Sequence, residues 1–247
     1  MEGIVIDELK LFRGEDFYVK EGIEIHIPSL GEICDYGEED YWSLVHSITS
    51  VGADMKFQLY DIGIDYTEIS DYQLFYNVLK RGLTPERTSI LFGNLDFMKF
   101  ELNVDGDTGK VLLYDEENDI DFDEYTYLLV VDVIRRLHGK KRNDQIPANE
   151  STKMILIEDA REEYLMNKNK DYQSQLKDMI SALVNSEGFK YNHNEVWDMK
   201  INTFLDSVKR ISKIKNVDLL LQSGYSGFGV DLKKISNKQL DWLGELE

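Results

Sequence analysis

The sequence predicts an α+β protein: a mixed N-terminal region with a β-hairpin, short strands and helices, followed by a mainly α-helical C-terminal region. In the first half, apolar residues alternate with polar ones, as in half-buried strands; in the second half they recur every three or four residues, as in amphipathic helices. The character changes near residue 150. We therefore predict an acidic mixed domain over 1–142, a linker over 143–150 and a mainly helical domain over 151–247.

The first strand is predicted over residues 21–27, where isoleucines alternate with polar side chains. Ser29 and Glu32 then have the spacing of a capping box, which predicts a helix from Ser29 to about residue 49, broken near Gly37. Further helical stretches are predicted over about 54–61, over about 68–82 and from Thr84 with Pro85.

A hairpin is predicted from residues 98–104 and 110–114, two alternating runs that flank a turn rich in Asp and Gly. An acidic tract over 115–124 leads into a helix whose apolar stripe contains Tyr127, Val130, Val131 and Ile134. That helix ends in a basic cluster over 135–142, where cations suit the negative end of the helix dipole.

Helical stripes dominate after residue 151. The two clearest stripes contain Leu176, Met179, Ile180, Leu183 and Val184, and then Ile201, Phe204, Leu205, Val208 and Ile211. A glycine-rich turn over 224–229 follows, and the spacing of Ser236 and Gln239 predicts a capping box at the start of a last helix.

Charge is unevenly distributed between the two halves. Residues 1–142 carry 30 Asp and Glu against 14 Lys and Arg, whereas residues 143–247 carry 17 against 14. An anionic surface repels nucleic acid phosphates and anionic membranes and attracts basic protein segments. We therefore expect a protein partner, with no membrane and no nucleic acid. The basic clusters at 135–142 and 209–215 are interpreted as cations at helix C-termini.

The single cysteine, Cys34, lies in an apolar periodic stretch and is expected to be a buried small hydrophobe, which fits a reducing compartment. The N-terminus has no basic stretch of the kind that opens a secretory signal, and no run of 18 apolar residues occurs. These features predict a soluble cytoplasmic protein.

Tests for catalytic and ligand-binding motifs are negative. The spacing of Asn103, Asp105 and Asp107 begins like a calcium loop, but Thr108 and Tyr114 occupy the positions that need Gly and Glu, so a hairpin turn is favoured. The four histidines lack zinc-ligand spacing, no Gly-x-Ser-x-Gly occurs, and the glycine-rich turn lacks the ending of a nucleotide loop. We expect no catalytic, cofactor-binding or metal site, and no enzyme.

Four stretches resemble a family of proteins encoded by tailed bacteriophages of Gram-positive hosts. They are residues 25–39, 60–65, 87–93 and 226–242. Members of that family resemble proteins labelled as tail assembly chaperones or tail-module proteins. The matching motifs are turn and packing signatures without chemistry, so the resemblance implies a phage origin and transfers no catalytic residue.

The resemblance implies a carrier for other phage structural proteins, such as tape-measure or tail proteins, that is located in the host cytoplasm or associated with the virion. An anionic body opposes aggregation while an apolar seam engages a helix. The hypothesis places the contact surface in the helical C-terminal half, at Tyr225, Phe228, Lys233, Lys234 and Trp242. The alternative for these five is that the aromatic side chains close the core and the lysines are solvated.

Three other interpretations remain open. The protein could be a virion structural subunit, such as a connector, an adaptor or a tail component. It could be an acidic DNA mimic that inhibits a basic host defence protein, in which case binding should weaken steeply with added salt. It could also be an enzyme whose site leaves no recognisable motif.

Overall fold

The computed structural model describes residues 6–106, 109–226, 229–244 and 246. The elements of the first part, in which η denotes a short 3-10 helix, are α1 (Glu8–Phe12), β1 (Phe17–Lys20), β2 (Ile23–Ile25), α2 (Leu30–Tyr36), α3 (Glu38–Thr49), η1 (Gly52–Asp54), α4 (Lys56–Asp61), α5 (Asp71–Asn77), η2 (Leu79–Gly82), α6 (Pro85–Phe92), η3 (Phe97–Lys99), β3 (Glu101–Val104), β4 (Val111–Asp115), β5 (Ile120–Phe122) and α7 (Glu124–Leu137). They are followed by α8 (Glu150–Asn167), α9 (Gln175–Val184), η4 (Glu195–Asp198), α10 (Ile201–Tyr225), η5 (Leu232–Lys234) and α11 (Asn237–Leu240). The predicted α+β class is confirmed.

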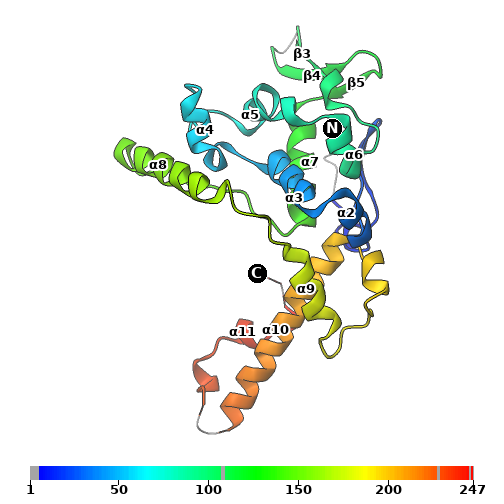
Figure 1. Cartoon of the computed structure of the whole chain (residues 1–247), viewed down its shortest axis with the longest axis vertical. Helices are drawn as coiled ribbons and strands as arrows, with labels where there is room; N and C mark the ends of the chain where they lie inside the picture. Colours follow the sequence, from blue (N-terminus) through cyan, green and yellow to red (C-terminus); the bar gives the residue numbers. More distant parts are fainter. Residues whose placement is uncertain (1–5, 107–108, 227–228, 245, 247) are drawn as a thin grey trace.

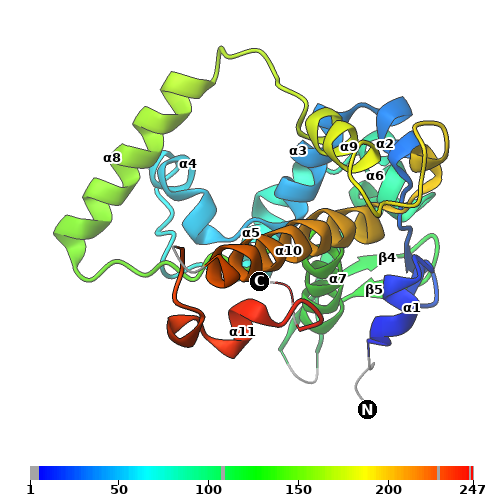
Figure 2. The ribbon, with the colours of Figure 1, turned by 90° about the horizontal axis from the view of Figure 1, so that it is seen from below.

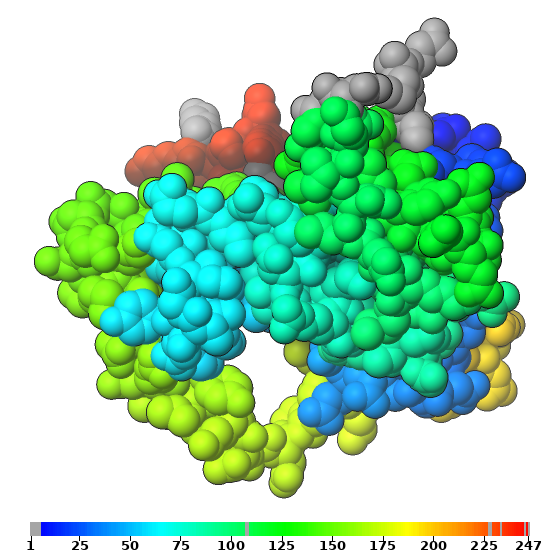
Figure 3. All heavy atoms as spheres, turned by 90° about the horizontal axis from the view of Figure 1, so that it is seen from above, coloured from blue at the N-terminus to red at the C-terminus, as the bar shows by residue number. Residues whose placement is uncertain are grey.

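The N-terminal elements form a body from which two long helices extend. In Figure 1, α8 reaches out to the left, whereas α10 runs down and away from the body. Seen from above, an opening separates the segment after α8 from α3 and α4 (Figure 3). The two long helices therefore leave the body in different directions.

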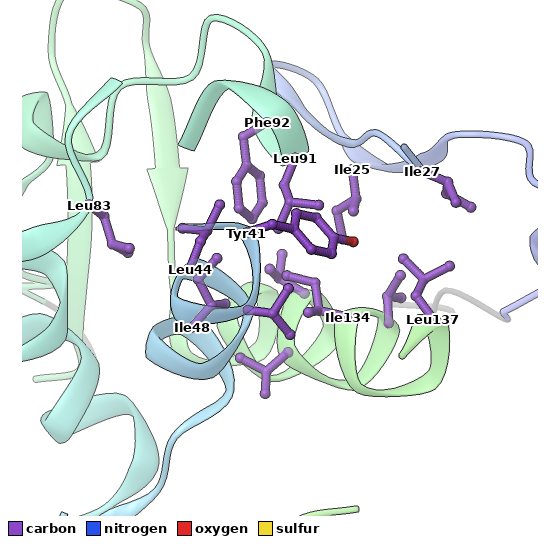
Figure 4. Packing of buried hydrophobic residues seen from close by; sticks show 14 of the residues in the cluster. Ile25, Ile27, Tyr41, Leu44, Ile48, Leu83, Leu91, Phe92, Ile134 and Leu137 are labelled. Atoms are coloured by element: carbon purple, nitrogen blue, oxygen red, sulfur yellow. The ribbon is translucent and has the colours of Figure 1, made fainter. Parts of the chain in front are cut away.

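The hydrophobic core lies between α3, α6, α7 and the β2 strand. Ile25, Tyr41 and Ile134 come from three of these elements, point toward one another and are fully buried (Figure 4). Burying one such aliphatic side chain contributes about 1.5–3 kcal/mol before entropy is counted. The apolar stripe predicted for α7 is confirmed, because its four members are all buried.

Local capping signals define the first helices as predicted. The Ser29 hydroxyl accepts a hydrogen bond from the Glu32 amide at 3.2 Å, and the Glu32 carboxylate accepts one from the Ser29 amide at 2.7 Å. Gly37 has a φ of 107°, a conformation that other residues rarely adopt, and it separates α2 from α3. The predicted break near Gly37 is therefore confirmed.

Two antiparallel sheets are present among the described residues: β1 pairs with β2, and β3, β4 and β5 follow one another. The predicted hairpin is confirmed, with Leu102 opposite Leu113. Its outer strand does not reach the core: the exposed fractions of Leu102 and Val104 are 55% and 61%. Strand β5, which buries Phe122, lies inside the acidic tract and was not predicted as a strand.

The expectation for Cys34 is wrong, because this side chain is exposed. Leu30 and Ile33 are the buried residues of α2, whereas Cys34, the next residue, lies on its exposed side and lines a hollow beside α9. A periodic apolar stretch predicts that one face of a helix is buried, but it does not show which other elements of the fold cover that face.

The two halves of the chain are joined by a short backbone ladder. The Leu30 amide donates to the Met199 carbonyl, and the Ile201 amide donates to the Pro28 carbonyl, each at 2.9 Å. From α3, the Glu38 carboxylate accepts hydrogen bonds from the amides of Gln175 and Leu176, both at 2.9 Å. A residue of the first half thus caps α9, and the start of α10 is tied to the end of β2.

Side chains at the boundary between the predicted first domain and the predicted linker bind the body. Arg142 forms two hydrogen bonds with the Asp71 carboxylate, at 2.8 and 2.9 Å. Asn143 donates to Asp54 at 2.8 Å. Helix α8 then packs on α4, where Arg161 makes a bidentate ion pair with Asp61. The division into two domains at 143–150 stays a prediction.

His138 is buried at the end of α7 in its neutral form. Its Nδ1 lies 2.6 Å from the Ile134 carbonyl oxygen, which can only accept, so Nδ1 donates there and Nε2 accepts the proton of the Tyr41 hydroxyl at 2.5 Å. Burial, aided by the charge of Lys140, lowers the pKa of His138 to about 4, although the bond to Ile134 opposes this.

The backbone at Gly52 packs closely against the backbone at Tyr66. A Cβ atom at Gly52 would lie 2.2 Å from the Tyr66 carbonyl oxygen, so Gly52→Ala should lower the free energy of unfolding by about 1–3 kcal/mol in urea denaturation. Gly106→Ala is the control: nothing lies within 4 Å of its Cβ position, and the expected change is within about 0.5 kcal/mol. Equal stability of the two variants would contradict the packing described here.

The buried His138 should make stability depend on pH. Because its folded-state pKa, about 4, lies below the ordinary value of 6.5, its contribution is complete above pH 6.5 and is lost as the pH falls toward 4. The slope reaches at most about 1.4 kcal/mol per pH unit. Urea denaturation of the wild type and of His138→Gln between pH 7.5 and 5 should show a shallower slope for the variant. Identical slopes would mean that His138 is not buried in the neutral form.

Candidate protein-binding surface

Helix α10 is anchored in the body by its first turns. Ile201 and Phe204, in its first turns, are fully buried in the body. Further along the described helix only Val217 is buried, whereas Leu219 and Tyr225 have exposed fractions of 63% and 81%. The distal part of α10 thus stands out from the body (Figure 1), and Leu219 and Tyr225 on it are exposed to solvent.

The segment after α10 folds back along it. Figure 2 shows α11 lying beside α10. Arg210, in the middle of α10, donates to the carbonyl oxygens of Trp242 and Gly244 at 2.6 and 2.9 Å. Gly224 permits the return, because a Cβ there would lie 2.2 Å from the Leu232 side chain. The capping box of Ser236 and Gln239 is present, which confirms the predicted last helix.

A groove of about 810 Å³ runs between α10 and this returning segment. Its walls on α10 are Lys209, Ser212, Lys213, Asn216, Leu219 and Leu220, and on the other side Ser236, Lys238, Gln239 and Leu246. The six α10 residues are spaced by three or four positions and so share one face of the helix. We call this feature the α10 groove.

The side chains that line the α10 groove change from charged to apolar along its length. Lysines 209 and 213 lie at the end near the body, and leucines 219 and 220 lie at the distal end. Residues 200–247, which contain the groove, carry eight Lys and Arg against six Asp and Glu, so this part of the chain is close to balanced in an otherwise acidic protein.

The basic cluster at 209–215 is not at a helix C-terminus, and that interpretation is corrected. Helix α10 continues to Tyr225, so these lysines lie in its middle, beyond the reach of the terminal dipole. The corresponding interpretation of the cluster at 135–142 is confirmed, because α7 ends at Leu137. The sequence signal for the groove was present as a three-and-four spacing, but four of its six members on α10 are polar, so they do not resemble a core stripe.

Of the five residues predicted to contact a partner, Tyr225 is 81% exposed at the tip of α10 and Trp242 is 48% exposed in the turn after α11. Lys234 is exposed in η5. Phe228 lies outside the described residues, as does the side chain of Lys233. Tyr225 and Trp242 do not form one patch: Trp242 is held at Arg210, about 15 residues or roughly 22 Å along the helix from Tyr225. Their role in binding stays a prediction.

A second hollow, of about 390 Å³, lies between α2, α9 and η4. Its walls are mainly apolar and include Ile33, Ile180 and Trp197, with Cys34 at its side. It is smaller than the α10 groove, and its apolar walls do not indicate a charge for a ligand.

His26 is the histidine with the most polar surroundings. Its Nδ1 lies 2.9 Å from the Asp16 carboxylate and its Nε2 lies 2.9 Å from Glu32. Burial lowers the pKa of His26, but the hydrogen bonds and charges of the two carboxylates raise it further, so the pKa is raised overall. Because both nitrogens are occupied, His26 is held as a clamp between β2 and α2 and offers no free lone pair for proton abstraction.

Much of the acidic tract is engaged within the protein. Asp115 accepts hydrogen bonds from the backbone amides of Glu117 and Asn118, and Asp119 accepts one from the Tyr114 hydroxyl. Glu117 forms an ion pair with Lys99, and Asp121 forms one with Lys20. Asp123 caps the start of α7. These carboxylates shape the turn between β4 and β5 and the start of α7. A surface that imitates DNA would instead present them to a partner.

Within the described ranges, no helix combines the length and apolarity that crossing a membrane requires. The described side chains also contain no group of three or more His, Cys, Asp or Glu placed to hold a metal ion.

Residues 167–247 match the family model of the YomV second domain, which is phage-associated. The match covers about a third of the 247-residue chain and contains α9, α10 and the returning segment. It supports a phage protein, and does not specify a role in tail assembly. No curated protein and no solved structure matches the chain.

Arg210→Ala should release the returning segment from α10. Each hydrogen bond from a charged donor is worth about 1.5–3 kcal/mol, less where solvent reaches it, so amide exchange over 237–244 should accelerate by about tenfold. Hydrogen–deuterium exchange with mass spectrometry measures this. Lys215→Ala, which removes only a bond to Ser186, is the control and should leave the segment unchanged. Unaltered exchange in Arg210→Ala would show that Arg210 does not hold the segment.

Proposed function

We propose that this protein is a non-catalytic factor of a phage virion assembly module, similar to a tail assembly chaperone, and that it acts by protein–protein contact in the host cytoplasm. The observation that carries the proposal is the position of the family match. The matched residues contain the projecting part of α10, with Leu219 and Tyr225 largely exposed. Exposed apolar side chains on a projecting helix are typical of a surface that another polypeptide covers.

The charge distribution supports a carrier role. The anionic first half opposes self-association and binding to nucleic acid, and the nearly balanced second half leaves the projecting helix free of that charge. The expected partners are other phage structural proteins, such as tape-measure or tail proteins. A tightly folded body with a separate binding arm allows the partner to be held without disturbing the core.

A virion structural subunit is the second candidate, and the same arm supports it, because a connector or tail subunit also needs a projecting contact surface. The two functions differ in the fate of the protein: a structural subunit remains in purified particles, whereas a chaperone is absent from them. The DNA-mimic alternative is less well supported, since several carboxylates of the acidic tract are engaged internally.

Co-purification from infected cells tests the proposal. The tagged wild-type chain should recover tail or tape-measure proteins, identified by mass spectrometry, and Tyr225→Ser should reduce their recovery by about tenfold if this exposed ring is a central contact. Tyr18→Ser is the matched control, because Tyr18 is also largely exposed but lies on β1 of the body.

A different partner would contradict the assembly function. If a host nuclease or restriction subunit dominates the recovered proteins, and its binding disappears with added salt, mimicry replaces assembly. If the purified chain turns over a small substrate and one substitution abolishes the rate, the non-catalytic assignment is wrong.

A further inference from the structure

We propose that His26 is a positively charged clamp: as an imidazolium between Asp16 and Glu32 it fastens the segment that anchors α10, and the loss of its proton in alkaline solution loosens that anchor. The inference goes beyond the proposed function, because it concerns a pH-sensitive device within the fold and needs no partner. It rests on the geometry around the ring and on the position of this segment beside the start of α10.

Both ring nitrogens of His26 face carboxylates. Nδ1 lies 2.9 Å from an oxygen of Asp16, and Nε2 lies 2.9 Å from an oxygen of Glu32. An ionised carboxylate only accepts hydrogen bonds, whereas a neutral imidazole carries a proton on one of its two nitrogens. A neutral His26 would therefore point a lone pair at one of the carboxylates. Both contacts are hydrogen bonds only when both nitrogens are protonated, and the ring then carries a positive charge.

The two carboxylates are themselves held in place by backbone amides. The second oxygen of Asp16 accepts a hydrogen bond from the Ile27 amide at 2.9 Å, and the second oxygen of Glu32 accepts one from the Ser29 amide at 2.7 Å. Burial raises the pKa of Glu32, but its hydrogen bonds with Ser29 and His26 outweigh burial and lower the pKa to about 2. Neither carboxylate can turn away from the ring without giving up its bond to an amide, so the ring has to supply both protons.

The other charged groups near the ring also favour the cation. His26 lines a hollow of about 570 Å³. Helix α6 packs against this segment, because the His26 amide donates to the Leu91 carbonyl at 2.8 Å, and its side chains in the hollow are the uncharged Ser89 and Phe92. Besides Asp16, the ionisable side chains that line the hollow are Tyr18, Lys20, Glu24, Asp96 and Asp115. Carboxylates outnumber the lysine, and an excess of negative charge stabilises a protonated ring.

The clamped segment holds the first turn of α10. Residues 28–30, between His26 and Glu32, form the backbone ladder with residues 199–201. Lys200 closes the ladder from the other side. Its ammonium group lies 3.7 Å from the second oxygen of Glu32, and its Cγ would lie 2.6 Å from a Cβ placed on Gly14. The loop before β1, the end of β2 and the start of α2 therefore meet where α10 begins, and His26 connects all three.

The clamp should weaken as the pH rises. The pKa of His26 in the folded state is raised above its ordinary value of 6.5, so the contribution of the clamp is complete below pH 6.5 and is lost as the pH rises through the folded-state pKa. This direction is opposite to that of His138, whose contribution is lost in acid. When His26 gives up a proton, one carboxylate keeps its hydrogen bond and the other faces a lone pair, so one side of the clamp opens.

NMR titration of the histidine rings in the full chain tests the charge. The signals of His26, assigned by their loss in His26→Gln, should show protons on both nitrogens at pH 6 and should titrate above pH 6.5. Glu32→Gln keeps a side chain that can cap the Ser29 amide but removes the negative charge, so the titration of His26 should move to lower pH. A His26 that titrates at or below pH 6.5, or whose titration is unchanged in Glu32→Gln, would overturn the inference.

Hydrogen–deuterium exchange with mass spectrometry tests the effect on α10. Between pH 6 and pH 9, the protection factors of amides in 28–31 and 199–204, corrected for the intrinsic exchange rates, should fall by at least about threefold in the wild type. In His26→Gln they should change by less than about twofold, because that side chain does not titrate. His193→Gln, which changes an exposed histidine in the loop before η4, is the control and should follow the wild type.

Two results of the exchange measurement would contradict the clamp: protection that stays constant in the wild type, or a loss of protection that is equal in the wild type and in His26→Gln. Circular dichroism at pH 6 verifies that each variant is folded. The NMR titration and the exchange of the wild type decide the inference even if His26→Gln fails to fold, and Glu32→Gln then assigns the ring signals by their shift.

Discussion

The structure depends on a few backbone hydrogen bonds between segments that are about 170 residues apart. The chain around Pro28 and Leu30 pairs with the chain around Met199 and Ile201, and this pairing inserts the first turn of α10 into the core. Closing so long a loop costs conformational entropy, which the burial of Ile201 and of neighbouring apolar side chains offsets. With its first turn fixed, a continuous helix has only one direction to take, so the projection of its distal part follows from the anchoring of its start.

The Glu38 carboxylate has a similar role at α9. Burial raises its pKa, but hydrogen bonds from Ser174 and from the helix amides lower it further, so the pKa is lowered overall and the group is ionised at neutral pH. The hydrogen bonds that Glu38 accepts from the start of α9 therefore stabilise the folded protein fully at pH values above the unfolded-state pKa of Glu38, and this contribution is lost as the pH falls. The buried His138 also lowers the stability as the pH falls, so the two effects have the same sign. Acidification should therefore weaken both the contacts between the halves at Glu38 and the packing at the end of α7.

Elements whose signals are local could be predicted. The capping box at Ser29, the break at Gly37 and the hairpin around residue 106 each depend on residues within a few positions of one another. Features that depend on distant neighbours could not. Strand β5 exists because Phe122 reaches the core, yet its sequence is dominated by acidic residues. Cys34 lies on an apolar helix but meets a hollow, and the lysines at 209–215 were assigned to a helix end because the length of α10 was not evident from its polar face.

The amino-acid order alone settles the α+β composition, the sites where most helices begin and the contrast between an acidic first half and a nearly balanced second half, because propensity, capping and charge are properties of short segments. Folding in three dimensions settles which apolar faces are covered and which remain open. It brings Arg210 to the carbonyls of Trp242 and Gly244, separates Trp242 from Tyr225 along α10, and assembles a graded groove from residues of two segments. These relations arise from contacts between parts of the chain that carry no mutual signal in their local sequence.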